Sequence, residues 1–240
     1  MSRLAGCWSL LALLLPGVAM AQGLEGSDQL IVVISRNWDD IQGTAQRYER
    51  HGQSFEKVEA PFAVVLGKHG MGWGKGLLDS GPLQGPVKEE GDGKAPAGIF
   101  RLGTAFGYAP GADTRLPYLA LSADIECVDD SQSRRYNQLV DDSIVARDWT
   151  SAERMHRNDD LYRQGIFIEH NTPASPAAGS CIFFHIWRGP STPTRGCTAM
   201  DPADIARLFN WLDPRQSPLL VQLPEAQYEQ LRVRWNLPER

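Results

Sequence analysis

The sequence predicts a mainly β domain with peripheral helices. Apolar runs such as Gln29–Ser35 and 61–67 are short, rich in Val and Ile, and bounded by turn residues, a pattern that favours buried strands over helices. Two helical patterns lie near the C-terminus, in 201–213 and 225–235. Because no internal repeat, low-complexity tract or long linker interrupts the chain, residues 22–240 are expected to form one domain.

The first residues have the pattern of a secretory signal peptide. Arg3 supplies a positive charge, 10–18 an apolar core, and Ala19-Met20-Ala21 a small-x-small cleavage site. The apolar stretch is too short to span a bilayer, so a retained anchor is the weaker alternative. No Cys follows the cleavage site, which argues against a lipoprotein. We expect residues 1–21 to be removed and the mature protein to be periplasmic, without a membrane attachment.

The charge balance excludes nucleic-acid binding as the main activity. The chain has 24 Lys and Arg against 29 Asp and Glu, a net charge of −5, and loss of Arg3 makes it one unit more negative. A polyanion partner would need a basic surface. Nothing in the sequence identifies a protein partner.

The N-terminal half reads as strands separated by glycine-rich loops. Residues 45–50 and 54–58 flank His51-Gly52-Gln53 and predict a hairpin. The glycine-rich stretch 68–94 predicts a loop with short ordered pieces. Residues 98–103 predict a strand, whereas 108–160 is polar and gives no clear assignment.

In the C-terminal half, 165–170 and 180–188 predict two strands around a Pro, Ala and Gly-rich loop. Strand alternation places one set of side chains in 180–188 on the core face and the other on the opposite face. The core set is Ile182, Phe184 and Ile186; the opposite set is Cys181, Phe183, His185 and Trp187.

A helix follows these strands. Asp201 is suited to the N-cap and Pro202 to the first helical position. Apolar side chains then recur with helical spacing until Asp213-Pro214 ends the run. Residues 218–223 predict a strand, and 225–235 a closing helix.

The mature chain keeps an odd number of cysteines. Cys7 leaves with the signal peptide, and Cys127, Cys181 and Cys197 remain in an oxidising compartment. A Cys127–Cys181 disulfide with Cys197 free is the simplest outcome. Three reduced thiols, or a disulfide that includes Cys197, remain alternatives.

The residues best suited to catalysis are His185 and the turn Thr194-Arg195-Gly196-Cys197. Cys197 follows His185 by twelve residues. A thiol and an imidazole supply the nucleophile and the base of an acyl-transfer enzyme. Gly196 would let backbone amides approach an oxyanion, and Arg195 adds a local cation.

Two other interpretations compete with catalysis. Cys and strand His residues are often structural, which is our expectation for His170. A zinc site could draw on Cys181, His185, Cys197 and His170, but the close Cys-x-x-Cys pair typical of such sites is missing. We therefore expect no metal and no cofactor.

These motifs resemble the signature of the bacterial L,D-transpeptidase (YkuD-type) catalytic domain. The resemblance is carried by Ser180-Cys-Ile-Phe-Phe-His-Ile-Trp187 and Pro193-Thr-Arg-Gly-Cys-Thr-Ala-Met200, with support from 91–100, 126–130 and 154–162. The last two segments are similar to a proteobacterial branch of the family. The chain departs from the family pattern at Arg195, where His is frequent, and in its shorter His185-to-Cys197 interval.

The resemblance implies a mixed β-sandwich and a cysteine acyltransferase that acts on peptidoglycan stem tetrapeptides in cell-wall cross-linking or remodelling and hence in cell shape. It implies Cys197 as nucleophile, His185 as base, and the amides of Gly196 and Cys197 at the oxyanion. The candidate substrate-binding residues are Thr194, Trp187, Arg188 and Arg195, the two arginines because they can bind carboxylates. An L,D-carboxypeptidase or amidase with the same Cys–His pair, or a non-catalytic peptidoglycan- or glycan-binding module, remains an alternative. The acyl acceptor stays open.

Overall fold

The computed structural model describes residues 23–78 and 84–240, so the predicted signal peptide lies outside the described residues. The mainly β prediction is confirmed, because strands dominate and only two α-helices occur in this part of the chain. None of the described helices is long and apolar enough to cross a membrane. The main sheet contains β1 (Gln29–Ser35), β2 (Gln42–His51), β3 (Ser54–Val65), β4 (Met71–Trp73), β5 (Ala95–Gly107), β6 (Tyr118–Ala120), β10 (Gln164–Ile168), β11 (Phe183–Ile186), β12 (Thr198–Met200) and β13 (Leu219–Pro224).

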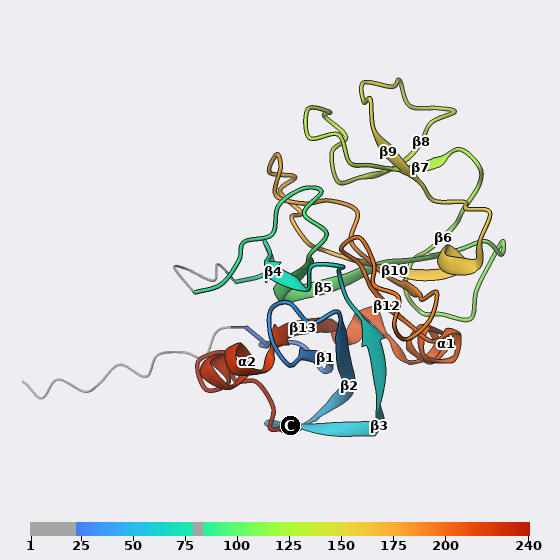
Figure 1. Cartoon of the computed structure of the whole chain (residues 1–240). Helices are drawn as coiled ribbons and strands as arrows, with labels where there is room; N and C mark the ends of the chain where they lie inside the picture. Colours follow the sequence, from blue (N-terminus) through green and yellow to red (C-terminus); the bar gives the residue numbers. More distant parts are fainter. Residues whose placement is uncertain (1–22, 79–83) are drawn as a thin grey trace, which may run out of the picture.

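The main sheet is mixed and closes on itself. Its order is β10-β11-β12-β3-β2-β1-β13-β5-β4, with β6 beside β5, and a further pairing joins β10 to β5. That pairing connects two distant places on the path, so the sheet curls into a barrel-like sandwich (Figure 1). The β1–β13 and β11–β12 pairs are parallel, and the β2–β3 hairpin is antiparallel as predicted.

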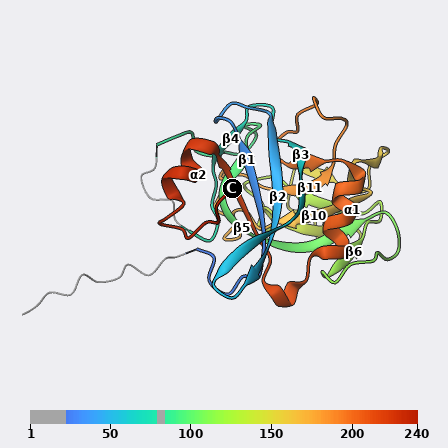
Figure 2. The same cartoon turned by 90° about the horizontal axis from the view of Figure 1, so that it is seen from below.

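The main core combines side chains of the curled sheet with the buried faces of two α-helices. Strand β1 is buried along almost its whole length, as its continuous apolar sequence predicts. The two α-helices, α1 (Pro202–Trp211) and α2 (Glu225–Leu231), cover the outside of the sheet (Figure 2). Asp201 caps α1 by accepting a hydrogen bond from the Ala203 N–H, and Pro202 occupies its first turn, which confirms the predicted start of this helix. Helix α2 is shorter than predicted, because turns replace the helix after Leu231.

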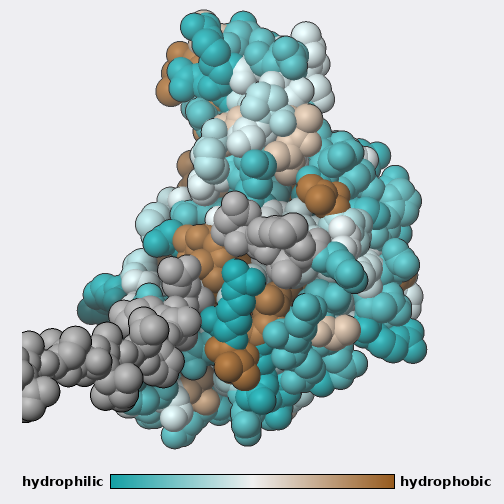
Figure 3. Space-filling model, turned by 90° about the vertical axis from the view of Figure 1, so that its left-hand side faces the viewer, coloured by the Kyte–Doolittle hydropathy of each residue, from teal (hydrophilic) through white to brown (hydrophobic). Residues whose placement is uncertain are grey.

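A second, three-stranded sheet forms within the segment that the sequence left unassigned. It contains β7 (Ile125–Val128), β8 (Leu139–Asp141) and β9 (Ala152–Arg154) in the order β8-β7-β9. We call it the small sheet. It projects from the main sheet (Figure 1), and its outer surface is largely hydrophilic (Figure 3). The short 3-10 helix η1 (Asp160–Tyr162) leads the chain back into β10.

The disulfide between Cys127 and Cys181 connects the small sheet to the main sheet. Cys127 lies in β7, and Cys181 lies two residues before β11 in a left-handed conformation, with φ of 56°. This turn explains why β11 starts at Phe183 and is shorter than the predicted strand 180–188. Cys197 is the free cysteine of the described chain, so the simplest of the three predicted thiol arrangements is the correct one.

Candidate active site

The sheet register brings Cys197 and His185 to the same face. In the parallel β11–β12 pair, Phe184 lies opposite Thr198 and His185 opposite Ala199. Cys197 immediately precedes β12 and lies beside Phe183, whose backbone N–H donates a hydrogen bond to the Cys197 sulfur at 3.3 Å. Since strand side chains alternate, Phe183, His185 and Cys197 point to one side of the sheet. The thiol and the imidazole are therefore diagonal neighbours.

The alternation predicted for this strand is confirmed, but both faces are covered. Ile182, Phe184 and Ile186 belong to the main core. Phe183, Cys181 and Cys197 belong to a second apolar cluster, which includes Tyr162 and residues of the small sheet. The residue Cys197 is only 8% exposed and His185 only 7%. A peptide can reach the sulfur only after some of these covering side chains have moved.

A network of hydrogen bonds fixes the turn before Cys197. The Thr194 hydroxyl donates to the Cys197 carbonyl oxygen at 2.6 Å and accepts from the Gly196 N–H at 3.0 Å. The Thr194 backbone is in turn bonded to Leu66 and Lys68 at the end of β3. Gly196 has φ of 151°, which an L side chain rarely adopts. Thr194 thus closes the turn, and the Gly196 amide is occupied in this resting structure.

The Cys197 thiol is neutral in this environment. Burial, and next the charge of Glu153, raise its pKa above the ordinary value, although the Phe183 N–H opposes the shift. The Cys197 sulfur also lies 3.5 Å from the Cys181 carbonyl oxygen, to which the neutral thiol can donate a hydrogen bond. Burial and the Glu153 charge outweigh the groups that favour ionisation, so the resting structure does not hold a preformed thiolate.

The His185 imidazole is neutral as well, because burial lowers its pKa to about 4. Its Nδ1 lies 2.8 Å from the Ile186 carbonyl oxygen. A carbonyl oxygen only accepts, so this contact assigns the proton to Nδ1 and leaves Nε2 as the basic nitrogen. The group that orients the imidazole is thus a backbone carbonyl. Tyr162 packs edge-on against the imidazole, with ring centroids 5.2 Å apart.

The alternative zinc site is not supported by this arrangement. The Cys181 sulfur is bonded to Cys127 and cannot serve as a thiolate ligand. His170 accepts from the Lys75 N–H through Nδ1 and contacts the Ala178 carbonyl oxygen through Nε2, which agrees with its predicted structural role. Within the described residues, no three His, Cys, Asp or Glu side chains are arranged to hold a metal ion.

The remaining predicted residues lie around this pair with different degrees of exposure. Trp187 is half-buried and continues the β11 pairing, since its N–H donates to the Met200 carbonyl oxygen at 2.9 Å. Arg188 is exposed and bonded to Asp159 at 3.0 Å. Arg195 is exposed on the Cys197 turn.

Sequence reasoning missed a charged network beside the pair. Glu153 accepts a hydrogen bond from the Tyr162 hydroxyl at 2.7 Å. Arg157 lies over the Tyr162 ring, 5.2 Å from its centroid, and forms ion pairs with Glu153 and Asp159. Arg188 extends this network through Asp159. Glu153, Arg157, Asp159 and Tyr162 lie in or next to the segment 154–162. The motif in this segment supported the family resemblance, but it did not show that the segment packs beside His185.

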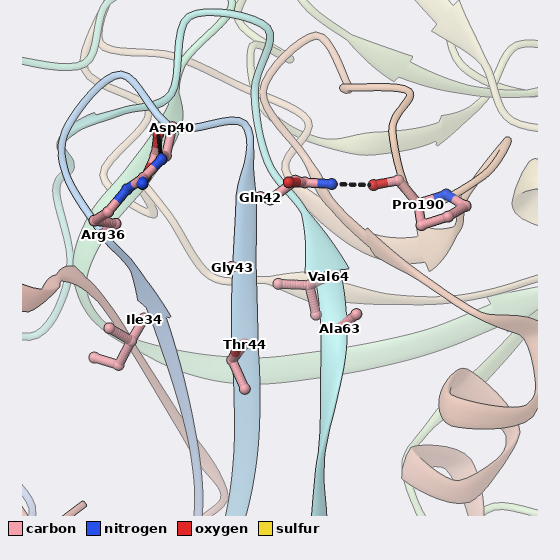
Figure 4. A pocket seen from close by; sticks show the side chains of 9 residues that line it. All are labelled: Ile34, Arg36, Asp40, Gln42, Gly43, Thr44, Ala63, Val64 and Pro190. Carbon is pink, nitrogen blue, oxygen red and sulfur yellow. Dashed lines mark hydrogen bonds and ion pairs between the residues drawn. The ribbon is translucent and has the colours of Figure 1, made fainter.

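A separate open pocket lies over β1, β2 and β3 and contains neither Cys197 nor His185 (Figure 4). At its edge the Gln42 side-chain amide donates to the Pro190 carbonyl oxygen at 2.8 Å. The contact ties the loop between His185 and Cys197 to β2.

The L,D-transpeptidase catalytic domain (YkuD) matches residues 43–221, which extend from β2 into β13 and include His185 and Cys197. The chain belongs to this family. The match confirms the resemblance on which the sequence interpretation relied, and the closed mixed sheet is consistent with the YkuD fold. No curated protein and no solved structure gives a significant match. The YkuD-type domain thus has a buried Cys–His pair on one face of β11 and β12, covered by a small sheet that a disulfide holds in place.

Proposed function

We propose that this YkuD-type domain is a periplasmic cysteine acyltransferase that acts on peptidoglycan stem tetrapeptides. The observation that carries the proposal is the shared face of Cys197 and His185, since it combines a free thiol with an imidazole whose basic nitrogen is defined. The family supports an L,D-transpeptidase-type reaction on peptidoglycan peptides. The export signal in 1–21 supports the periplasmic location.

In the first half-reaction, the Cys197 sulfur attacks the carbonyl carbon of the amide that joins the diaminopimelate residue to the terminal D-Ala. His185 Nε2 accepts the thiol proton as the carbon–sulfur bond forms. The imidazolium then donates that proton to the departing nitrogen, the carbon–nitrogen bond breaks, and D-Ala leaves. The product is a thioester on Cys197 and a neutral His185.

In the second half-reaction an amine attacks the thioester and gives a new amide. His185 takes one proton from the amine and returns it to the sulfur, so both groups regain their starting protonation states. The amine of a second stem, of a D-amino acid or of a lipoprotein Lys would complete a transpeptidation; water would complete an L,D-carboxypeptidase reaction. Water exclusion at the thioester decides between these outcomes, and the low exposure of Cys197 favours transfer.

The neutral resting pair determines how the thiol is activated. A thiolate–imidazolium pair at rest would need both pKa values to shift the other way. His185 therefore acts as a general base during attack, and the amides at the Cys197 turn stabilise the oxyanion, an effect worth about 3 kcal/mol per donor in comparable sites. The Gly196 amide must first leave the Thr194 hydroxyl to take part.

Intact-mass analysis tests the proposal. The protein is incubated with disaccharide tetrapeptide, and the expected result is an adduct equal to the substrate minus D-Ala, located on Cys197 by peptide mapping. Cys197→Ala should form no adduct while it keeps the wild-type unfolding midpoint, and His185→Gln should form the adduct about 100-fold or more slowly. A reduced, folded wild-type protein that never forms the adduct, and that a carbapenem also leaves unmodified, would contradict an acyltransferase. That result would favour a non-catalytic peptidoglycan-binding module.

A further inference from the structure

The carboxylate of Asp159 joins the segment before η1 to the end of β11. Its Oδ1 accepts a hydrogen bond from Arg157 Nε at 2.9 Å, and its Oδ2 accepts from Arg157 Nη2 at 3.1 Å and from Arg188 Nη2 at 3.0 Å. Oδ1 also accepts from the Leu161 N–H at 3.2 Å, so Asp159 caps η1. The hydrogen bonds from Arg157 lower the pKa of this carboxyl group below its ordinary value, so it is charged.

The backbone of Asp159 is anchored as well. Tyr108, which directly follows β5, donates from its hydroxyl to the Asp159 carbonyl oxygen at 2.8 Å. Arg188 lies two residues after the end of β11, and the chain enters β10 two residues after Tyr162. Since β10 pairs with both β5 and β11, these contacts fasten η1 to the ends of three neighbouring strands. Asp159 thus joins η1 to the sheet that carries His185.

Tyr162 is the residue through which η1 reaches the imidazole. Its buried ring packs edge-on against His185, with ring centroids 5.2 Å apart, and against Phe183 at 5.7 Å. The contact between His185 Nδ1 and the Ile186 carbonyl oxygen, at 2.8 Å, holds one edge of the imidazole. The Tyr162 ring restricts the remaining freedom of the imidazole, as packing does for well-ordered catalytic groups. The position of Nε2 therefore depends on where η1 lies.

The charges around the imidazole act on its protonation in opposite directions. Burial is the largest cause and lowers the pKa of His185, whereas the Ile186 carbonyl raises it. The charges of Arg157 and Arg188 lower this pKa further, and the charge of Asp159 raises it. Asp159 is bonded to both arginines. It therefore offsets two cations that oppose transfer of a proton to the imidazole.

The other titratable groups on this face leave that balance in place. Tyr162 and Cys197 are neutral, because burial raises the pKa of each. Glu153 reaches the face through its hydrogen bond with the Tyr162 hydroxyl at 2.7 Å, and burial raises the pKa of its carboxyl group. The network of Asp159 is thus the main source of charge that acts on His185.

The geometry points to Asp159 as a positioning residue for acyl transfer, which holds Tyr162 against the base and balances the two arginines. The inference rests on the proposed function and adds a residue outside the Cys–His pair on which the reaction depends. Asp159 acts through His185: it keeps Nε2 in place and favours the imidazolium that forms when the Cys197 thiol gives up its proton.

A double-mutant cycle with His185→Gln tests this role. Intact mass follows the rate at which disaccharide tetrapeptide forms the adduct on Cys197. Asp159→Asn should lower the rate at saturating peptide by about tenfold or more, and the half-saturating peptide concentration should stay the same because no substrate contact is lost. In the His185→Gln background the same change should have no further effect, since Asp159 acts through the imidazole.

Asp160→Asn is the matched control. It removes the neighbouring carboxylate, which is 74% exposed and pairs with Arg163 at 3.8 Å, and it should keep the wild-type rate. Unfolding midpoints at pH 7.5 establish that each variant is folded. A wild-type rate in Asp159→Asn, or an equal loss in the wild-type and His185→Gln backgrounds, would overturn the inference.

A titration of the His185 ring by NMR separates this role from a merely structural one. The ring signal is assigned with His185→Gln and followed against pH in the free protein. Asp159→Asn should move the midpoint to lower pH and Arg188→Gln to higher pH, each by about 0.5 pH unit. The two variants break the same ion pair, so loosening of the structure alone would move both midpoints in the same direction.

Shifts of the same sign would overturn the inference. If Asp159→Asn does not fold, the exposed variant Arg188→Gln decides the question, because a midpoint that stays or falls contradicts the balance of charge at His185. A wild-type protein that forms no adduct would instead overturn the proposed function. The ring titration needs no substrate, so the two failures are distinguishable.

Discussion

The disulfide between Cys127 and Cys181 offers a perturbation whose magnitude follows from the structure. The two residues are separated by 54 positions in the sequence. In the chain-entropy description, a cross-link that closes a loop of this length stabilises the folded state by about 4 kcal/mol at 25 °C. Replacing both cysteines with Ala should therefore lower the free energy of unfolding by up to about 4 kcal/mol, a large share of the 5–15 kcal/mol typical of a domain.

The small sheet has other attachments, so the variant is expected to fold. The Asn137 side-chain amide donates to the His170 and Asn171 carbonyl oxygens at 2.8 and 2.9 Å and accepts from the Cys181 N–H at 2.9 Å. The hydroxyl of Tyr136, which like Asn137 lies between β7 and β8, accepts a hydrogen bond from the Gly179 N–H at 3.1 Å. These bonds keep the small sheet near the face of Cys197 and His185 in the absence of the disulfide.

Urea unfolding followed by tryptophan fluorescence measures the effect. With a slope of about 2 kcal/mol per molar urea, a loss of about 4 kcal/mol lowers the midpoint by about 2 M. The single variant Cys197→Ala is the control, since it removes a thiol but no cross-link, and its midpoint should lie within about 0.5 M of the wild type. A Cys127→Ala, Cys181→Ala double variant with the wild-type midpoint and slope would refute the argument that this loop closure stabilises the domain.

Three further predictions concern the buried histidines and the Cys197 turn. Burial lowers the pKa values of His170 and His185 from the ordinary 6.5 to about 4. Both histidines are neutral in the folded and unfolded states above pH 6.5, whereas below it the unfolded state binds protons that the folded state does not. Each histidine should therefore lower the free energy of unfolding by about 3 kcal/mol as the pH falls to 4. Urea midpoints at pH 7.5 and 4.5 check this, and a His170→Gln variant should show a smaller difference. Gly196→Ala should destabilise the fold by about 1–3 kcal/mol through its φ of 151°, and more than Gly189→Ala, which has φ of 152° but no atom within 4 Å of the added Cβ; equal thermal midpoints would contradict the crowding at Gly196. Thr194→Val should reduce thioester formation much more than Thr194→Ser, which retains the hydroxyl that closes the turn; similar rates for the two variants would show that this hydrogen bond is unimportant.

The strands of the main sheet were predictable because burial imposes a pattern on their sequence. Gln29–Ser35 was found with the correct ends, since a strand buried on both faces is a continuous apolar run. The N-cap of α1 was equally clear, because Asp201 and Pro202 satisfy two local requirements at once. The face of β11 that carries Phe183 and His185 also followed from alternation alone.

The small sheet was not predictable from local pattern. Its strands have only three or four residues, and they are held by long-range contacts. Cys127 is tied to Cys181, and buried Glu126 accepts a hydrogen bond from the Trp149 indole at 2.9 Å. The sequence suggested the disulfide but not the strand pairings around it, so the polar segment 108–160 gave no clear assignment.

The burial of Cys197 and His185 was missed for the same reason. Alternation predicted which face carries His185 but not what covers that face, and the cover comes from the small sheet and Tyr162. Without that cover, Glu153 could not be placed near Cys197. Cys127 lies opposite Glu153 across β7 and β9. This register brings Glu153 to the face that carries the disulfide, and no short sequence motif encodes it.

The cover also leads to a prediction about reaction outcome under the proposed function. A thioester on Cys197 would form beneath the second apolar cluster, where few water molecules reach it. Loosening the small sheet by the Cys127→Ala, Cys181→Ala double variant should let water compete with an amine acceptor. The measurement is the ratio of hydrolysed tripeptide to D-amino-acid exchange product at a fixed acceptor concentration. We expect the ratio to rise several-fold in the double variant, whereas Asp124→Asn, which changes an exposed residue next to β7, should leave it unchanged. A ratio equal to that of the wild type would mean that the Cys–His face itself, rather than the sheet above it, controls the access of water.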